Sequence, residues 1–322
     1  MTTHAQPHKS DKYIRVDGTN FSINQISASG QCFRMTEQED GSFQVIANGR
    51  RLRLKQEQPS YQTPSPYQAQ SPSQNQPQTS GDELSTSKEF QKNSVILMDC
   101  SEEDFQTIWK SYFDLDTDYS RFLTSIDPDD TYLRSAVAYG HGIRILRQDL
   151  WEMIISFIIS QQNNIRRIRK CIETICTHYG TKIDPTNDTD TCSDSFYLFP
   201  TPEQLATATE EEFRALGLGY RSRYLVETAR SIVSGEVSLD ALRQMDYPSA
   251  RAELLKLCGV GAKVADCICL FGLHHLEAFP IDTHIRQVLT AHYPDGFPFD
   301  SYAGYEGVLQ QYIFYYDLNS GH

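Results

Sequence analysis

The chain has 322 residues, of which 39% are hydrophobic, and its formal net charge is -13 at pH 7. This length is sufficient for two or three modest domains with buried cores. The acidic total argues against a nucleic-acid partner, because phosphate binding usually requires a basic surface. That argument weakens once the charges are located, since an acidic block lies between residues 114 and 130 and basic residues cluster elsewhere.

The first residues, MTTHAQPHKSDK, contain no apolar segment typical of a signal peptide, and we expect residues 1–11 to be a disordered tail. The longest apolar run, 154–159, is interrupted by Ser156 and is far too short to span a bilayer. The eight cysteines are irregularly spaced and form no zinc-binding pattern. We therefore expect an intracellular protein with reduced thiols, no bound metal and no membrane partner.

The first part of the chain, residues 12–120, has the pattern of an antiparallel β-sheet domain. We expect strands in the segments that alternate apolar and polar residues or are rich in β-branched residues, namely 13–16, 21–26, 43–54 and 95–98. The third of these segments contains Asn48-Gly49, which is typical of a tight hairpin turn, so it comprises two strands.

A segment of different composition interrupts this domain at residues 56–92. Of residues 56–80, 18 are Gln, Ser or Pro, and such a segment buries too little apolar surface to offset its chain entropy. We expect a disordered insertion. A partner-binding role is one interpretation, and a tolerated surface loop is the favoured one.

Residues 121–322 have helical patterns. Residues 151–159 are apolar on all sides, as in a core helix, and the next helix carries Ile165, Ile168, Ile172 and Ile175 on one face. Asn163 or Asn164 is suited to cap that second helix. Its other face is basic, with Arg166, Arg167, Arg169 and Lys170, and is either solvated or directed at DNA. Further on, we expect a long loop at 180–199 and helices at 202–216, 225–234 and from residue 303 onward.

The most informative stretch is Leu254–Leu289, which contains a helix-hairpin-helix pattern at residues 250–273. The glycines of Gly259-Val260-Gly261 allow a tight turn and leave backbone N–H groups open to a phosphate. Lys263 follows in the first turn of the second helix, where the helix dipole and partial burial favour a neutral amine, so we expect a lowered pKa. Asp282 is suited to cap another helix. A lysine and a carboxylate in one cleft would suit imine chemistry at a sugar carbon.

Each of these features alone has an ordinary structural interpretation, because many helix pairs turn on glycine and many aspartates cap helices. Together, GVGAKVADC and PIDTH resemble the helix-hairpin-helix DNA glycosylase superfamily and, within it, the 8-oxoguanine DNA glycosylases. The resemblance implies that Lys263 is the nucleophile and Asp282 the assisting carboxylate, with no metal or organic cofactor. Some relatives bind an iron–sulfur cluster through four cysteines after the hairpin, but no cysteine follows Cys269 here.

The resemblance also implies a pocket for an extruded base. SGQCFR, at residues 29–34, is similar to the motif in which a glycine carbonyl, here that of Gly30, accepts a hydrogen bond from N7–H of 8-oxoguanine. The C-terminal helix resembles the pocket helix and would place Gln310 on the Watson–Crick edge and Phe314 on one ring face. Cys267 would lie against the other face, and His284 would contact a phosphate.

Two further segments, SQQNNIRRI and LGLGYRSRY, resemble the loops that fill the gap left by the flipped base. Gln162, Asn163 and Asn164 belong to the first loop; some family members have asparagine at the position of Gln162, so the strictness of cytosine recognition is left open. Arg167 and Arg221 would recognise the orphaned cytosine, and Tyr220 would wedge the stack.

We therefore expect an α+β protein in which the N-terminal antiparallel sheet packs on a mainly helical glycosylase domain. Its implied function is excision of 8-oxoguanine opposite cytosine from double-stranded DNA, with lyase cleavage, by an intracellular, DNA-associated monomer. Two alternatives stay open: an alkylated-base glycosylase that uses water, against which Lys263 argues, and a DNA-binding module without catalysis.

Overall fold

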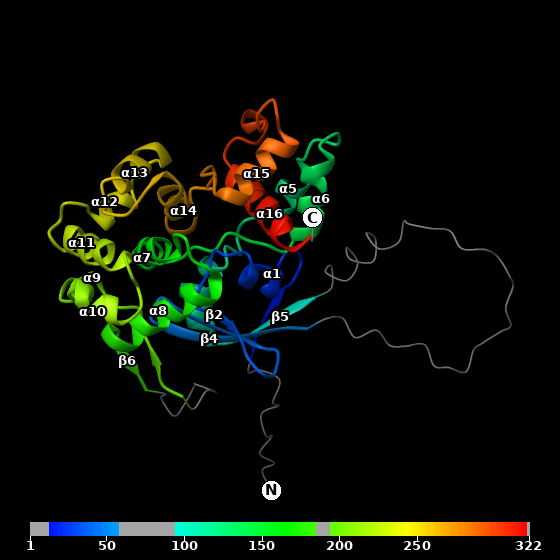
Figure 1. The fold of residues 1–322 in the computed structure, drawn as a ribbon. Coiled ribbons are helices and arrows are strands. Elements are labelled where there is room, and N and C mark those ends of the chain that lie inside the picture. Colours follow the sequence, from blue (N-terminus) through cyan, green and yellow to red (C-terminus); the bar gives the residue numbers. More distant parts are fainter. Residues whose placement is uncertain (1–12, 58–93, 185–193, 321–322) are drawn as a thin grey trace, which may run out of the picture.

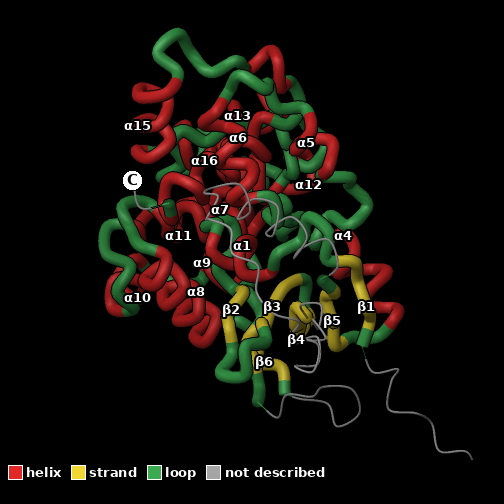
Figure 2. Tube along the Cα trace, turned by 90° about the vertical axis from the view of Figure 1, so that its right-hand side faces the viewer, coloured by secondary structure: helices red, strands yellow, loops and turns green. Residues whose placement is uncertain are grey.

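The computed structural model describes residues 13–57, 94–184 and 194–320. A five-stranded antiparallel sheet forms one end of the molecule, and most of the helices form the other end (Figures 1 and 2). The strand order is β1-β5-β4-β3-β2, with bounds β1 Ile14–Asp17, β2 Met35–Glu37, β3 Phe43–Ala47, β4 Arg50–Glu57 and β5 Val95–Asp99. The predicted α+β architecture is confirmed. The expected tail, residues 1–11, lies outside the described residues.

The predicted hairpin joins β3 to β4. Asn48 and Gly49 have φ values of 49° and 75°, which are the left-handed values that a tight primed turn requires. Ala47 therefore pairs directly with Arg50, and the register continues to Phe43 opposite Leu54. This register directs Val45, Leu52 and Leu54 into the core beneath the sheet.

The expected strand at residues 21–26 is wrong, because this segment forms helix α1, Ile23–Ala28. The Ser22 hydroxyl caps the helix by accepting from the Gln25 amide, which fixes a helical start within an alternating sequence. Ile23 and Ile26, three residues apart, are both buried against the sheet. The alternation that suggested a strand is thus also compatible with one turn of helix.

The expected start of the insertion at residue 56 is also wrong, since β4 continues through Glu57 and pairs with β5 there. The side chain of Gln56 donates to the Phe21 carbonyl at 2.9 Å and accepts from the Ile23 amide at 3.1 Å. Gln56 therefore ties the sheet to α1. The remainder of the expected insertion, residues 58–92, lies outside the described residues.

The helices of the second part form two groups with α7 and α14 between them (Figure 1). Their bounds are α5 Ser120–Thr124, α6 Thr131–Gly140, α7 Leu150–Ser160, α8 Ile165–Tyr179, α9 Pro202–Ala206, α10 Glu210–Ala215, α11 Arg221–Val233, α12 Leu239–Leu242, α13 Tyr247–Leu254, α14 Ala262–Gly272, α15 Thr283–His292 and α16 Glu306–Asn319. Short helical segments, α3 Glu102–Asp104, η1 Phe105–Trp109 and α4 Lys110–Tyr112, pack on the sheet, and η2 Phe299–Tyr302 precedes α16. No helix within the described ranges is long and apolar enough to cross a bilayer.

Two predicted boundaries in this part need correction. The helix expected at residues 202–216 is two helices, because Thr209 begins a new capping box with Glu212 and ends the continuity after α9. The loop expected at residues 180–199 includes a small two-stranded sheet, in which Lys182–Ile183 pairs with Phe196–Tyr197. Residues 185–193 between these strands lie outside the described part of the chain.

Candidate active site

Helix α7 brings three separate segments of the chain together at its C-terminal end. All residues from Leu150 to Ile159 are buried, as predicted for a core helix, and α7 contacts α8, α11 and α14. The helix ends at Ser160, and residues 161–164, which we name the α7–α8 junction, connect it to α8. Gln162 has φ 47° and its side chain is exposed, so the backbone turns sharply there and presents that amide to solvent.

The junction is held by hydrogen bonds to two other segments, the hairpin turn and the start of α11. The Gln161 side chain donates to the Gly259 carbonyl at 2.9 Å, and the Arg221 guanidinium donates to the carbonyls of Gln161 and Gln162, the latter at 3.1 Å. Arg221 is only 5% exposed, and its guanidinium lies over the ring of Tyr220. In the free protein Arg221 is thus engaged within the fold, and its recognition of cytosine remains a prediction.

The other predicted residues of this region make contacts within the fold, and of the two expected cap residues Asn164 is the one that caps α8. Asn164 caps α8 by accepting from the Arg167 amide, and the Asn163 side chain donates to the Ile159 carbonyl. Arg167 is exposed and donates to the Gly217 carbonyl at 3.3 Å, so it bridges the junction to the loop before α11. Tyr220 in that loop is 45% exposed, as a residue that inserts into a base stack must be.

The predicted hairpin is formed by α13 and α14. Gly259 has φ 80°, and a β-carbon at this position would overlap the ring of Tyr224, so both conformation and space require glycine. Val260 is buried and anchors the turn, whereas Gly261, which precedes α14, is exposed and has open space around it. The amides at the start of α14 are therefore accessible to an anion.

Lys263 and Asp282 line one small cavity, although 18 residues separate them in the sequence. Its volume is about 40 Å³, and its lining includes Gly30, Cys267, Gln310 and Phe314. Asp282 caps α15 by accepting from the Ile285 amide at 2.8 Å, which fixes its carboxylate at the cavity wall. The Lys263 ammonium lies 5.5 Å from the centre of the Phe157 ring, on α7.

The expected lowering of the Lys263 pKa is wrong. Burial lowers this pKa, but the neighbouring Cys267 and the charge of Asp282 together raise it by a larger amount. The net pKa therefore lies above its ordinary value. Burial keeps the pKa of Cys267 high as well. Lys263 is therefore an ammonium in the free protein at neutral pH, because its two neighbours outweigh the effect of burial.

Gly30, Gln310 and Phe314 line the same cavity, whereas His284 lies outside its lining, against Phe314. Gly30 has φ 75°, and a β-carbon there would lie 3.3 Å from the Phe314 ring, so the loop and α16 are in close contact. Gln310 is 3% exposed and donates to the Pro280 carbonyl at 3.1 Å. His284 is exposed, pairs with Asp317 at 3.1 Å and meets Phe314 edge-on.

Gln311 also lines this cavity, and the sequence reasoning missed it. Within α16, the resemblance assigned roles only to Gln310 and Phe314, so Gln311 was not identified as a pocket residue. The available signal was the pair of adjacent glutamines in an otherwise apolar and aromatic helix.

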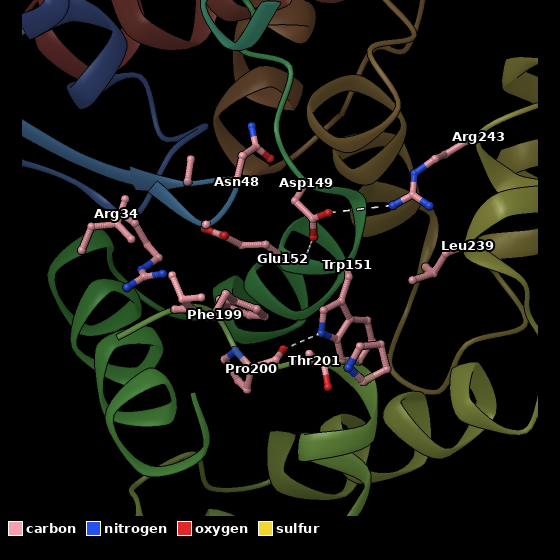
Figure 3. Close-up of a pocket in the computed structure, with 15 residues that line it drawn as sticks. Arg34, Asn48, Asp149, Trp151, Glu152, Phe199, Pro200, Thr201, Leu239 and Arg243 are labelled. Atoms are coloured by element: carbon pink, nitrogen blue, oxygen red, sulfur yellow. Dashed lines mark hydrogen bonds and ion pairs between the residues drawn. The ribbon is translucent and has the colours of Figure 1, made fainter. Parts of the chain in front are cut away.

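A larger cavity, of about 330 Å³, lies at the opposite end of α7 (Figure 3). Asp149 pairs there with Arg243, and burial raises the pKa of Glu152 to about 7. None of the predicted site residues lines this cavity. Lys263 and Asp282 line the smaller cavity instead.

Two family models match adjoining parts of the chain. The N-terminal domain of 8-oxoguanine DNA glycosylase matches residues 13–154, and the HhH-GPD superfamily of base excision DNA repair proteins matches residues 155–296. The boundary between the two matches falls within α7, so the central helix belongs to both.

Solved structures and curated proteins give the same relationship. The chain is similar to MBOgg1 in complex with a low affinity DNA ligand, with 31% identity, a TM-score of 0.78 and 98% of both chains covered. It is also similar to Clostridium acetobutylicum 8-oxoguanine glycosylase/lyase in complex with dsDNA containing cytosine opposite 8-oxoG, with 31% identity, a TM-score of 0.78 and 97% of each chain covered. The N-glycosylase/DNA lyase of Saccharomyces cerevisiae is 34% identical over 215 residues, which are 62% of this chain and 54% of that relative. The chain spans about half the length of the curated relatives it matches.

The two glycines of the hairpin provide a stability test. Gly259→Ala should lower the free energy of unfolding by about 1–3 kcal/mol, because it introduces a strained φ and a clash with Tyr224. Gly261→Ala is the matched control and should change it by no more than about 0.5 kcal/mol. Urea denaturation of both variants provides the comparison, and equal stability would contradict the geometry assigned to the turn.

Proposed function

Because this chain belongs to the 8-oxoguanine DNA glycosylases of the HhH-GPD superfamily, we propose that it excises 8-oxoguanine paired with cytosine from double-stranded DNA and then cleaves the strand as a lyase. The observation that carries this proposal is the single cavity lined by Lys263, Asp282 and Cys267 together with Gly30, Gln310 and Phe314. A nucleophile, a carboxylate and the wall of a base pocket are thereby combined in one place.

The proposed chemistry begins at the sugar of the extruded nucleotide. The bond between C1′ and the base breaks, and the base leaves with its electron pair while Asp282 stabilises the positive charge on the sugar. The Lys263 nitrogen then bonds to C1′, and opening of the sugar ring gives an imine. Loss of a proton from C2′ finally expels the 3′ phosphate and cuts the strand.

The protonation state of Lys263 adds one requirement to these reaction steps. Since its pKa is raised, Lys263 must lose a proton before its nitrogen can bond to C1′. The departing base needs a proton, because it takes the electron pair of the glycosidic bond. Transfer from Lys263 to the base would satisfy both needs in one step, and we assign this transfer to the excision reaction.

The pocket must open before a base can enter. Its volume of about 40 Å³ is far below the roughly 300–1,000 Å³ of typical small-molecule sites. Phe314 contacts the Gly30 loop and is only partly buried, so its ring is the part of the wall best placed to move. With the ring displaced, a base could stack on Phe314 and reach the Gly30 carbonyl.

The proposed DNA-facing surface consists of the α7–α8 junction, Tyr220, Arg167, the hairpin amides and His284. Extrusion of a base leaves a gap that exposed Gln162 and Tyr220 are placed to fill, and the accessible amides of α14 are suited to a phosphate. This local surface explains how an acidic chain would bind DNA. The proposed place of action is therefore cellular DNA, with the nucleus or the bacterial nucleoid as the corresponding compartments.

Strand cleavage tests the proposed function directly. Wild-type protein should nick a duplex carrying 8-oxoguanine opposite cytosine, whereas Lys263→Gln should lose on the order of a thousandfold or more in rate. Asp282→Asn should lose on the order of a hundredfold while still capping α15 through its amide oxygen. Asp246→Asn, at the cap of α13, is the matched control and should be as fast as wild type. Single-turnover rates on a denaturing gel measure all four, and a fully active Lys263→Gln would refute the assignment.

The pH dependence of base release follows from the raised pKa of Lys263. The rate should fall at high pH, because only the ammonium form of Lys263 can give its proton to the departing base. Cys267→Ala removes the first of the two neighbours that raise this pKa, so the fall should move to lower pH. Cys269→Ala removes a nearby buried thiol that does not line the cavity and should leave the midpoint unchanged. An unshifted Cys267→Ala profile would show that Cys267 does not control the ammonium.

A further inference from the structure

Gln311 has a polar atom for which the fold provides no partner. The residue lies on α16, is 3% exposed and lines the cavity that holds Lys263. Its Nε2 donates to Gln310 Oε1 at 3.0 Å, but no donor among the described residues reaches its buried Oε1. A buried acceptor without a donor destabilises a folded protein, so its presence in a binding cavity requires an explanation.

The orientation of this amide is fixed by a chain of contacts that starts at Pro280. The Pro280 carbonyl can only accept, so the Gln310 amide must direct Nε2 toward it. Gln310 Oε1 then faces Gln311, which must in turn present Nε2 to it. Rotating either amide by 180° would bring two acceptors together, and Gln311 Oε1 therefore remains the unpaired atom.

We propose that Gln311 Oε1 accepts a hydrogen bond from the extruded base and selects a guanine-type edge through its exocyclic 2-amino group. This inference rests on the proposed excision of 8-oxoguanine and names a further residue that determines its specificity. Gln310 and Gln311 both line the cavity, and the hydrogen bond from Gln311 Nε2 to Gln310 Oε1 holds their amides next to each other. A guanine-type edge carries two adjacent donors, N1–H and the 2-amino group, and is the base edge that satisfies both acceptors.

The same arrangement explains why the two glutamines act together. The Gln311 amide holds Gln310 in the orientation in which Oε1, which has a second lone pair, can accept from N1–H. An edge without the 2-amino group would fill the cavity but leave Gln311 Oε1 buried and unpaired. Sites that contain such a polar group reject analogues that lack its partner, because the loss appears in the transition state as well as in binding.

The test compares two lesions that differ only in the 2-amino group, 8-oxoguanine and 8-oxohypoxanthine, each opposite cytosine in the same duplex. Wild-type protein should release 8-oxoguanine roughly tenfold faster or more, as expected for one buried hydrogen bond. In Gln311→Met, which keeps the length of the side chain but has no amide, the two rates should agree to within about twofold. Gln311→Asn withdraws the acceptor by one methylene and should give the same loss of preference if the methionine variant does not fold.

A second buried glutamine provides the matched control. Gln148 is 9% exposed, donates to the Gln31 carbonyl and does not line the cavity. Gln148→Met should lose a buried hydrogen bond and some stability, yet preserve the preference for 8-oxoguanine. A thermal unfolding scan of each variant separates stability from selectivity.

The possible results distinguish this inference from the proposed function. Equal slowing of both lesions in the Gln311 variants, or a wild-type protein that does not discriminate between them, would overturn the role of Gln311 while leaving excision intact. Release of neither lesion by wild type would overturn the proposed function and this inference with it. Loss of preference in Gln311 variants but not in Gln148→Met supports the inference.

Discussion

The structure depends on one constraint, which is the need to satisfy the last carbonyl groups of a helix that is buried on every side. Helix α7 is enclosed by the rest of the fold, but its C-terminal end reaches the surface, where its carbonyls lack partners within the helix. Donors from Arg221 and Asn163 supply these partners, and the Gln161 side chain ties the same end to the Gly259 carbonyl. The hairpin, the α11 loop and the α7–α8 junction are thereby fixed to one another.

The same helix connects this surface to the cavity. Phe157 on α7 stacks on Phe271 of α14 and lies beneath the Lys263 ammonium, so the apolar core forms the floor of the cavity. The proposed flipping of a nucleotide requires a surface that replaces the lost base in the stack and a cavity that receives the base. Helix α7 positions both.

The features that could be predicted from the sequence are those that depend only on residues close together in the chain. The Asn48-Gly49 turn, the buried α7, the cap at Asn164 and the hairpin were predictable, because each follows from a short pattern with one physical solution. The α1 segment was mistaken for a strand, since Phe21 and Ile23 alternate with polar residues as in a strand, whereas Ile23 and Ile26, three residues apart, share a face only in a helix. The pocket residues were reached through family resemblance. The raised pKa of Lys263 and the unpaired oxygen of Gln311 were not predictable, because both depend on neighbours that come from distant parts of the chain.

The central claim is that Lys263 forms a covalent bond with the sugar at this cavity. Reduction with borohydride during turnover on an 8-oxoguanine duplex converts an imine into a stable amine, and proteolysis followed by mass spectrometry then locates the modified residue. The account predicts that the sugar remnant is found on the peptide that contains Lys263. A remnant on another lysine, or base release without any trapped adduct, would contradict it.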